Sequence, residues 1–137
     1  MLRTLFTATL FGLLTIGAAS AQNRSTLEAQ IPFDFTVGHQ AMNAGLYRIV
    51  FNPSSSMLTV QGRDAHSTTA FTLASPGGNS TASGTGKLVF DCGGGACSLA
   101  KVLPAADSGR DLQVSQPSRR VQMVMQTRVV PILRAAQ

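Results

Sequence analysis

Cys92 and Cys97 are the only cysteines in the chain, and three of the four residues between them are glycines. Consecutive glycines tolerate the positive φ angles of a tight turn, so the two thiols can meet across a four-residue hairpin loop. Redox motifs need Cys-x-x-Cys spacing, and two cysteines with two distant histidines do not form a recognisable zinc set. We therefore predict a structural disulfide. By limiting the conformations of the unfolded chain, it should add about 2 kcal/mol to the free energy of unfolding.

The remaining reactive side chains form no catalytic motif. His39 and His66 are the only histidines, and each lies in a polar, turn-like segment. The chain contains neither Gly-x-Ser-x-Gly nor His-Glu-x-x-His, and Gly86-Lys87 lacks the other residues of a phosphate-binding loop. Its single glutamate, Glu28, lies near the N-terminus, while the aspartates mostly occupy predicted turns, so no carboxylate pair is expected. We predict a noncatalytic protein without a cofactor or a metal site.

The positive charge is concentrated near the C-terminus. Residues 22–111 carry equal numbers of basic and acidic side chains, whereas the last 26 residues contain Arg119, Arg120, Arg128 and Arg134 and no acid. These arginines could contact an anionic envelope polymer or membrane surface, or they could simply keep a neutral domain soluble. Four spaced arginines are not a dense basic stripe, so we expect no nucleic-acid partner.

Residues 1–21 have the three parts of a secretory signal peptide. Arg3 supplies the positive charge, Leu5 to Ala18 is apolar and uncharged, and Ala19-Ser20-Ala21 is a small-x-small cleavage site. A 14-residue stretch is too short to cross a hydrocarbon core of about 30 Å as a helix. We predict cleavage after Ala21 and a secreted or periplasmic mature chain without a transmembrane span, a compartment in which disulfides persist.

Composition and periodicity favour short strands and turns. Only 12% of the residues are charged, whereas glycines and prolines number 13 and 6. Apolar residues alternate in one segment after another, and Phe71 and Leu73 define the expected core face of the fourth. The first two segments are expected to pair as a hairpin. The six predicted strands are residues 31–37, 46–51, 57–61, 68–74, 87–91 and 98–103.

This spacing predicts an all-β fold, a small antiparallel β-sandwich or partly closed barrel of about six to eight short strands. We assign residues 22–111 to this β-domain and residues 112–137 to a basic C-terminal segment, partly docked or flexible. Val121, Met123 and Met125 alternate as in a strand, but the residues after Pro117 could equally begin a helix.

Three blocks of sequence resemble a family of small secreted bacterial β-rich proteins that is itself uncharacterised. They are Ile-Pro-Phe-Asp-Phe-Thr-Val-Gly at 31–38, Ala-Gly-Leu-Tyr-Arg-Ile at 44–49 and Lys-Leu-Val-Phe at 87–90. The resemblance implies export and a β-rich domain, and it brings no catalytic residue. The chain departs from it at Asn43, where a proline is usual, and in the turn between the two cysteines.

Three functional hypotheses follow from these features. The first is a secreted or periplasmic module that contacts another protein or contributes to envelope structure, because the chain is strand-rich and has no reactive constellation. The second is a small barrel or sandwich that holds an apolar ligand between its sheets, which requires a ligand-sized void. The third is attachment of the basic C-terminal segment to an anionic envelope surface.

Overall fold

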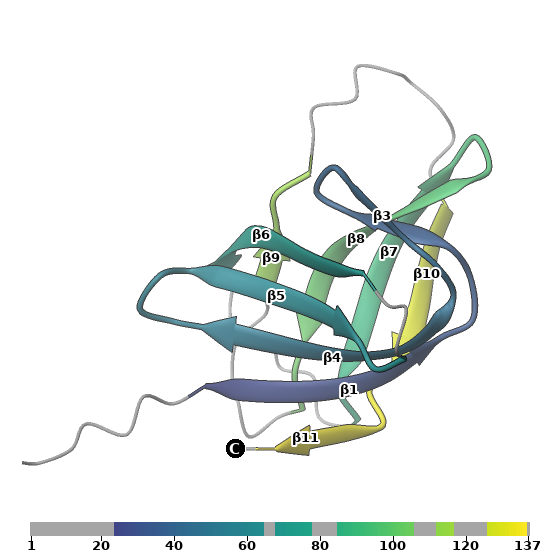
Figure 1. Ribbon diagram of the computed structural model, residues 1–137. Helices are drawn as coiled ribbons and strands as arrows, with labels where there is room; N and C mark the ends of the chain where they lie inside the picture. The colour runs from purple at the N-terminus through teal and green to yellow at the C-terminus, as the bar shows by residue number, and fades with distance from the viewer. Residues whose placement is uncertain (1–23, 65–67, 78–84, 106–111, 117–125, 137) are drawn as a thin grey trace, which may run out of the picture.

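The computed structural model describes residues 24–64, 68–77, 85–105, 112–116 and 126–136, and this part of the chain is all-β (Figure 1). It contains eleven strands, more than the six to eight expected. Four of them have only three residues, which is too short for an alternating pattern to be recognised in the sequence. The predicted signal peptide lies outside the described residues. The strands are β1 (Ser25–Ile31), β2 (Phe35–Val37), β3 (Gln40–Met42), β4 (Gly45–Asn52), β5 (Met57–Gly62), β6 (Thr69–Pro76), β7 (Lys87–Gly93), β8 (Ala96–Leu103), β9 (Leu112–Val114), β10 (Gln126–Pro131) and β11 (Arg134–Ala136).

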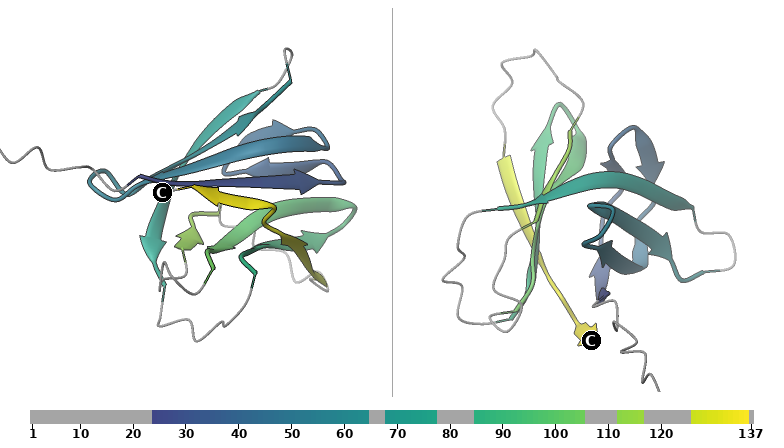
Figure 2. Two further views of the ribbon diagram at one scale, coloured as in Figure 1. Left: turned by 90° about the horizontal axis from the view of Figure 1, so that it is seen from below. Right: turned by 90° about the vertical axis from the view of Figure 1, so that its left-hand side faces the viewer.

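The strands form two layers with the core between them (Figure 2). The first sheet has the order β11-β1-β4-β5-β6, and all its strand pairs are antiparallel. The second sheet has the order β10-β7-β8-β9. The short β2–β3 hairpin joins this second sheet through a parallel pairing of β2 with β8.

Two segments connect the layers. The first half of β6 pairs with β5 in the first sheet, and its end, residues Ala74 to Pro76, pairs with β9 in the second sheet. At the opposite side, β10 lies on β7 while β11 lies on β1, only a few residues later. The strand order ends at β10 and β11 without pairing them, so the sheets do not close into a barrel. The molecule is a small β-sandwich with corners where the chain changes sheet.

Aromatic rings fill the centre of the core. Phe90 on β7 is fully buried, and the rings of Phe33 and Phe35 approach it edge to face, with centroids 5.1 and 5.4 Å away. Tyr47 on β4 meets Phe35 in the same geometry at 5.1 Å. Because these rings come from both layers, they join the two sheets.

The strands predicted around residues 46–51, 57–61, 87–91 and 98–103 are confirmed as β4, β5, β7 and β8. The single strand predicted over 31–37 is wrong, because the chain breaks between Ile31 and Phe35. Pro32 cannot donate a ladder hydrogen bond, and the Asp34 carboxylate accepts one from the Ala44 N–H at 2.8 Å. The predicted hairpin is therefore divided: β1 pairs with β4, and β2 pairs with β3.

The predicted core face of β6 is also wrong. Phe71 and Leu73 are 63% and 61% exposed, whereas Ala70 and Ala74 are buried. Because β6 lies at a corner and pairs with one strand of each sheet, the face that carries Ala70 and Ala74 packs into the common core, and Phe71 and Leu73 lie on the opposite face. Alternation located the strand correctly, and the size of the side chains indicated the wrong face.

The described part of residues 112–137 consists of strands that belong to the sandwich. β9 joins β8 to β6, β10 pairs along the length of β7, and β11 pairs with β1. Val130 and Ile132 are buried in the common core. These residues thus complete both sheets, and the segment contributes to the fold as well as to the charge.

Candidate functional site

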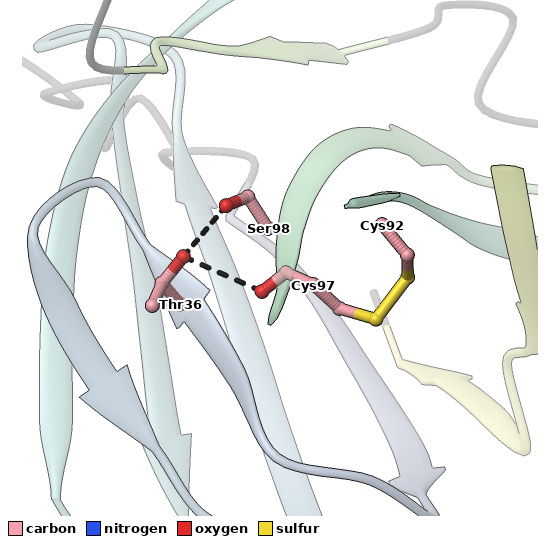
Figure 3. Close-up of a disulfide and its surroundings, with 4 residues drawn as sticks. All are labelled: Thr36, Cys92, Cys97 and Ser98. Carbon is pink, nitrogen blue, oxygen red and sulfur yellow. Dashed lines mark hydrogen bonds between the residues drawn. A yellow bond between two sulfur atoms is a disulfide. The ribbon is translucent and has the colours of Figure 1, made fainter. Parts of the chain in front are cut away.

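The predicted disulfide between Cys92 and Cys97 is present (Figure 3). The two residues are directly opposite each other in the β7–β8 hairpin, with Cα atoms 4.0 Å apart. The loop is shorter than predicted, because Gly93 pairs with Ala96 and leaves only Gly94 and Gly95 in the turn. Their φ angles of 60° and 81° are those of a two-residue turn that matches the twist of a hairpin. The glycines therefore form the turn itself, and the disulfide links Cys92 and Cys97, the second residue pair of the hairpin after the turn.

A hydroxyl pair fastens β2 beside this disulfide (Figure 3). The Thr36 hydroxyl donates to the Cys97 carbonyl at 3.4 Å, and its oxygen lies 2.7 Å from the Ser98 hydroxyl oxygen. A hydroxyl has one proton, so while Thr36 donates to the carbonyl it accepts from Ser98. The disulfide links β7 to β8, and the hydroxyl pair links β8 to β2, so these groups hold three strands together at this end of the molecule.

The structure describes two of the four predicted arginines, Arg128 and Arg134. Arg119 and Arg120 lie outside the described residues. Arg128 is exposed on β10, and its guanidinium carbon lies 5.2 Å from the centroid of the Phe33 ring, a cation–π contact. Arg134 lies on β11, where its backbone pairs with Glu28 of β1. The two described arginines thus belong to different sheets.

Charged groups cluster at two other places. On β1, the Glu28 carboxylate forms ion pairs with Arg63 and, at 3.6 Å, with Arg48. Near the start of β4, the Tyr47 hydroxyl donates to the Asn43 carbonyl at 2.6 Å. Burial raises the pKa of Tyr47, and the nearby carboxylates of Asp34 and Asp64 raise it further. Both clusters consist of partnered groups in the described structure.

The histidines and acids have no metal-binding arrangement in the part of the chain that the structure describes. There, no group of three or more His, Cys, Asp or Glu side chains is placed to hold an ion. His39 is exposed in the β2–β3 turn, and His66 lies outside the described residues.

The candidate site is an apolar pocket at one end of the sandwich, with a volume of about 430 Å³. Buried leucine and isoleucine side chains from the first sheet, Leu27, Ile49 and Leu58, form one wall, and Leu112 of β9 lies opposite. Prolines and serines surround these apolar side chains, and none of the described lining residues carries a charge. The other lining residues are Ser25, Phe51, Pro53, Ser56, Pro76 and Pro104.

Sequence reasoning identified two strands of this pocket, β4 and β5, but neither β1 nor β9 nor the pocket itself. The alternation of β4 and β5 indicated that Ile49 and Leu58 face inward. Prolines such as Pro53, Pro76 and Pro104 are typical of breaks and turns, and their convergence on one pocket depends on the topology of both sheets. A sequence signal for β1 was present, since Leu27, Ala29 and Ile31 continue the alternation upstream of the predicted strand.

Comparisons with protein-family models, curated proteins and solved structures find no match to this chain. The resemblance to small secreted bacterial proteins stays a prediction. No helix among the described residues has the length and hydropathy of a membrane span.

Proposed function

We propose that the protein is a noncatalytic, extracytoplasmic module that binds a small, uncharged, mainly apolar molecule between its two sheets. The observation that carries the proposal is the pocket of about 430 Å³ bounded by Leu27, Ile49 and Leu58 on one side and Leu112 on the other. Its volume lies in the range of small-molecule sites, about 300 to 1,000 Å³. The second hypothesis predicts a ligand-sized interior void, and this pocket, although partly open to solvent, supports that hypothesis.

The lining determines the chemistry of the ligand. An ionised ligand would lose its hydration without gaining a counter-charge, since none of the described lining residues is ionisable. An apolar ligand instead covers hydrocarbon surface, which is favourable by about 25 cal/mol per Å². The hydroxyl groups of Ser25 and Ser56 among the lining residues can serve a single polar group of the ligand.

Fluorescence titration with N-phenyl-1-naphthylamine, an uncharged apolar probe, tests this proposal. We expect saturable binding, and Pro104→Trp should weaken it by about tenfold because the larger side chain, at a position that lines the pocket, takes up part of its volume. Leu73→Trp is the matched control, since Leu73 is exposed on β6 and does not line the pocket. Absence of saturable binding, or equal binding by wild type and Pro104→Trp, would overturn the proposal.

A second candidate function is contact with another protein. It is favoured by Met57, Phe71 and Leu73, which are exposed on β5 and β6, with Met57 directly opposite Leu73. Large apolar side chains that adjoin on a surface are typical of interaction sites. The second candidate agrees with the first of the three sequence hypotheses.

Attachment of the C-terminal arginines to an anionic surface stays a prediction. Deletion of residues 112–137 cannot test it, because it would remove β9, β10 and β11 from the sandwich. Replacement of Arg119 and Arg120 by glutamine tests the charge alone, and retention on vesicles that contain anionic lipid should then decrease if these arginines make the contact.

A further inference from the structure

One edge of β6 is paired along only half of its length. Residues Ala74 to Pro76 pair with β9, whereas Thr69 to Leu73 pair with β5 on the opposite edge. β9 leaves β6 after the Ser115 N–H donates to the Leu73 carbonyl at 3.0 Å. Beyond this bond, no strand in the described structure lies against the outer edge of Thr69 to Phe71.

The printed hydrogen bonds determine which backbone groups face this open edge. The Ala74 N–H donates to Ser56 and the Thr68 carbonyl accepts from Gly62, so the even-numbered residues of β6 bond on the β5 side. Backbone groups alternate from one edge of a strand to the other, residue by residue. The N–H and C=O groups of Phe71 and Thr69 therefore point away from β5, on the same side as the Leu73 carbonyl.

The sequence explains why β9 does not continue along this edge. In the observed register, Val114 pairs with Ala74 and Ser115 bonds to Leu73, so a continued ladder would bring Pro117 opposite Phe71. Proline has no N–H and cannot donate to the Phe71 carbonyl. In the described structure, the pairing of β9 with β6 ends at Ser115, two residues before this proline.

A groove follows the open edge. It has a volume of about 530 Å³ and lies between the turn of the β2–β3 hairpin, at Gly38 and His39, and residues Thr69 to Leu73 of β6. The hairpin turn lies close to the middle of β6, since a Cβ atom at Gly38 would lie 3.6 Å from the Thr72 hydroxyl oxygen. None of the described residues that line the groove is an aspartate, glutamate, lysine or arginine. A charged occupant would lose hydration without gaining an opposite charge, so the groove favours an uncharged one.

We propose that this groove binds an extended, uncharged segment of another protein, which adds to the first sheet as a strand beside β6. The segment would exchange backbone hydrogen bonds with Phe71 and Thr69, and its apolar side chains would cover the exposed Phe71 and Leu73. This inference rests on the second candidate function and specifies its partner. It does not depend on the apolar pocket, which lies among other residues.

The probe for the test is the uncharged peptide acetyl-Thr-Val-Thr-Val-Thr-Val-Thr-amide, titrated into the full mature chain and followed by amide hydrogen exchange. We expect the peptide to slow exchange at the Phe71 and Thr69 amides. The Ala70 amide, which faces β5, is the internal control and should not change. A peptide methylated at the backbone nitrogens on one edge should lose binding, whereas methylation on the opposite edge should have no effect.

Two variants separate the backbone donor from the side chain. Phe71→Ala keeps the outward N–H, and Phe71→Pro removes it without removing a bond to β5. We expect Phe71→Pro to bind the peptide about five- to tenfold more weakly than Phe71→Ala, the effect of one backbone hydrogen bond. If Phe71→Pro does not fold, the two methylated peptides still show whether backbone hydrogen bonds on one edge of the peptide are needed for binding.

Three results would overturn the inference: unchanged exchange at Phe71, protection centred on another strand edge, or concentration-dependent pairing of two copies of the chain through β6. Binding of N-phenyl-1-naphthylamine in the same samples reports on the pocket separately. Failure of the edge to bind the peptide is thus distinguishable from failure of the pocket to bind its ligand. A partner could also bind the Phe71 and Leu73 side chains without protecting the edge amides from exchange. That result would support protein contact as a function and overturn the strand-addition inference.

Discussion

The hydroxyl oxygens of Thr36 and Ser98 lie 2.7 Å apart, at the parallel contact between β2 and β8. Thr36→Val keeps the shape of the side chain but leaves the Ser98 hydroxyl and the Cys97 carbonyl without this partner. We expect the free energy of unfolding to fall by about 1 to 2 kcal/mol, which urea denaturation can measure. A double-mutant cycle with Ser98→Ala provides the control. Strictly additive effects would show that the two hydroxyls do not interact.

Replacing both Cys92 and Cys97 by alanine should lower the free energy of unfolding by about 2 kcal/mol, because the disulfide closes a short loop. Reduction of the wild type should have an effect of similar size. The hairpin itself should persist, since the turn at Gly94 and Gly95 does not depend on the sulfur atoms. Nuclear Overhauser contacts between β7 and β8 in the variant would verify this, and their loss would contradict it.

Gly95→Ala separates the turn from the disulfide. Gly95 has a φ of 81°, and a Cβ atom there would have no neighbour within 4 Å, so the cost is purely conformational. We expect a loss of about 1 to 2 kcal/mol in thermal or urea unfolding. An unchanged stability would mean that the turn adopts another conformation.

Because Phe71 is exposed, we expect its replacement to have little effect on stability. The alternating pattern alone would predict a large loss, as for a core residue. Phe71→Ser should change the free energy of unfolding by less than about 0.5 kcal/mol, because the side chain is 63% exposed. Phe90→Ala should cost about 3 to 5 kcal/mol, because Phe90 is fully buried among the rings of Phe33 and Phe35. Comparable losses in the two variants would place Phe71 in the core and contradict the observed face of β6.

Tyr47 should make stability depend on pH above about 10. Its pKa is raised by burial and by Asp34 and Asp64, so folding favours the neutral phenol. The resulting stability is complete below the ordinary pKa of about 10 and is lost as the pH rises through the raised value. Tyr47 is the only tyrosine, so phenolate absorbance reports its ionisation directly.

Tyr47→Phe is the control for this titration. It should lower stability by about 1 kcal/mol near neutral pH, through loss of the hydrogen bond to Asn43, and should flatten the alkaline dependence. A midpoint at or below the ordinary value for tyrosine would show that the phenol is not buried beside the two carboxylates.

The disulfide was predictable because both of its determinants are local. Cys92 and Cys97 are five positions apart, and the glycines between them allow a turn that brings the thiols together. The apolar pocket was not predictable, since Leu27 and Leu112 meet there although they are far apart in the chain. The open edge of β6 has a partial sequence signal in Pro117, but this signal becomes interpretable only when the register between β6 and β9 is known.

By itself, the sequence determined where the five consecutive strands β4 to β8 lie and that the chain folds as an all-β protein, because alternation and turn residues act over a few neighbouring positions. Tertiary structure decided which face of β6 is buried, where the segment from Ile31 to Phe35 breaks, and how the two sheets join. The physical reason is that alternation defines two faces of a strand, whereas burial depends on which distant strands cover each face. At the corner formed by β6, the small side chains of Ala70 and Ala74 fit between the layers, and Phe71 remains outside.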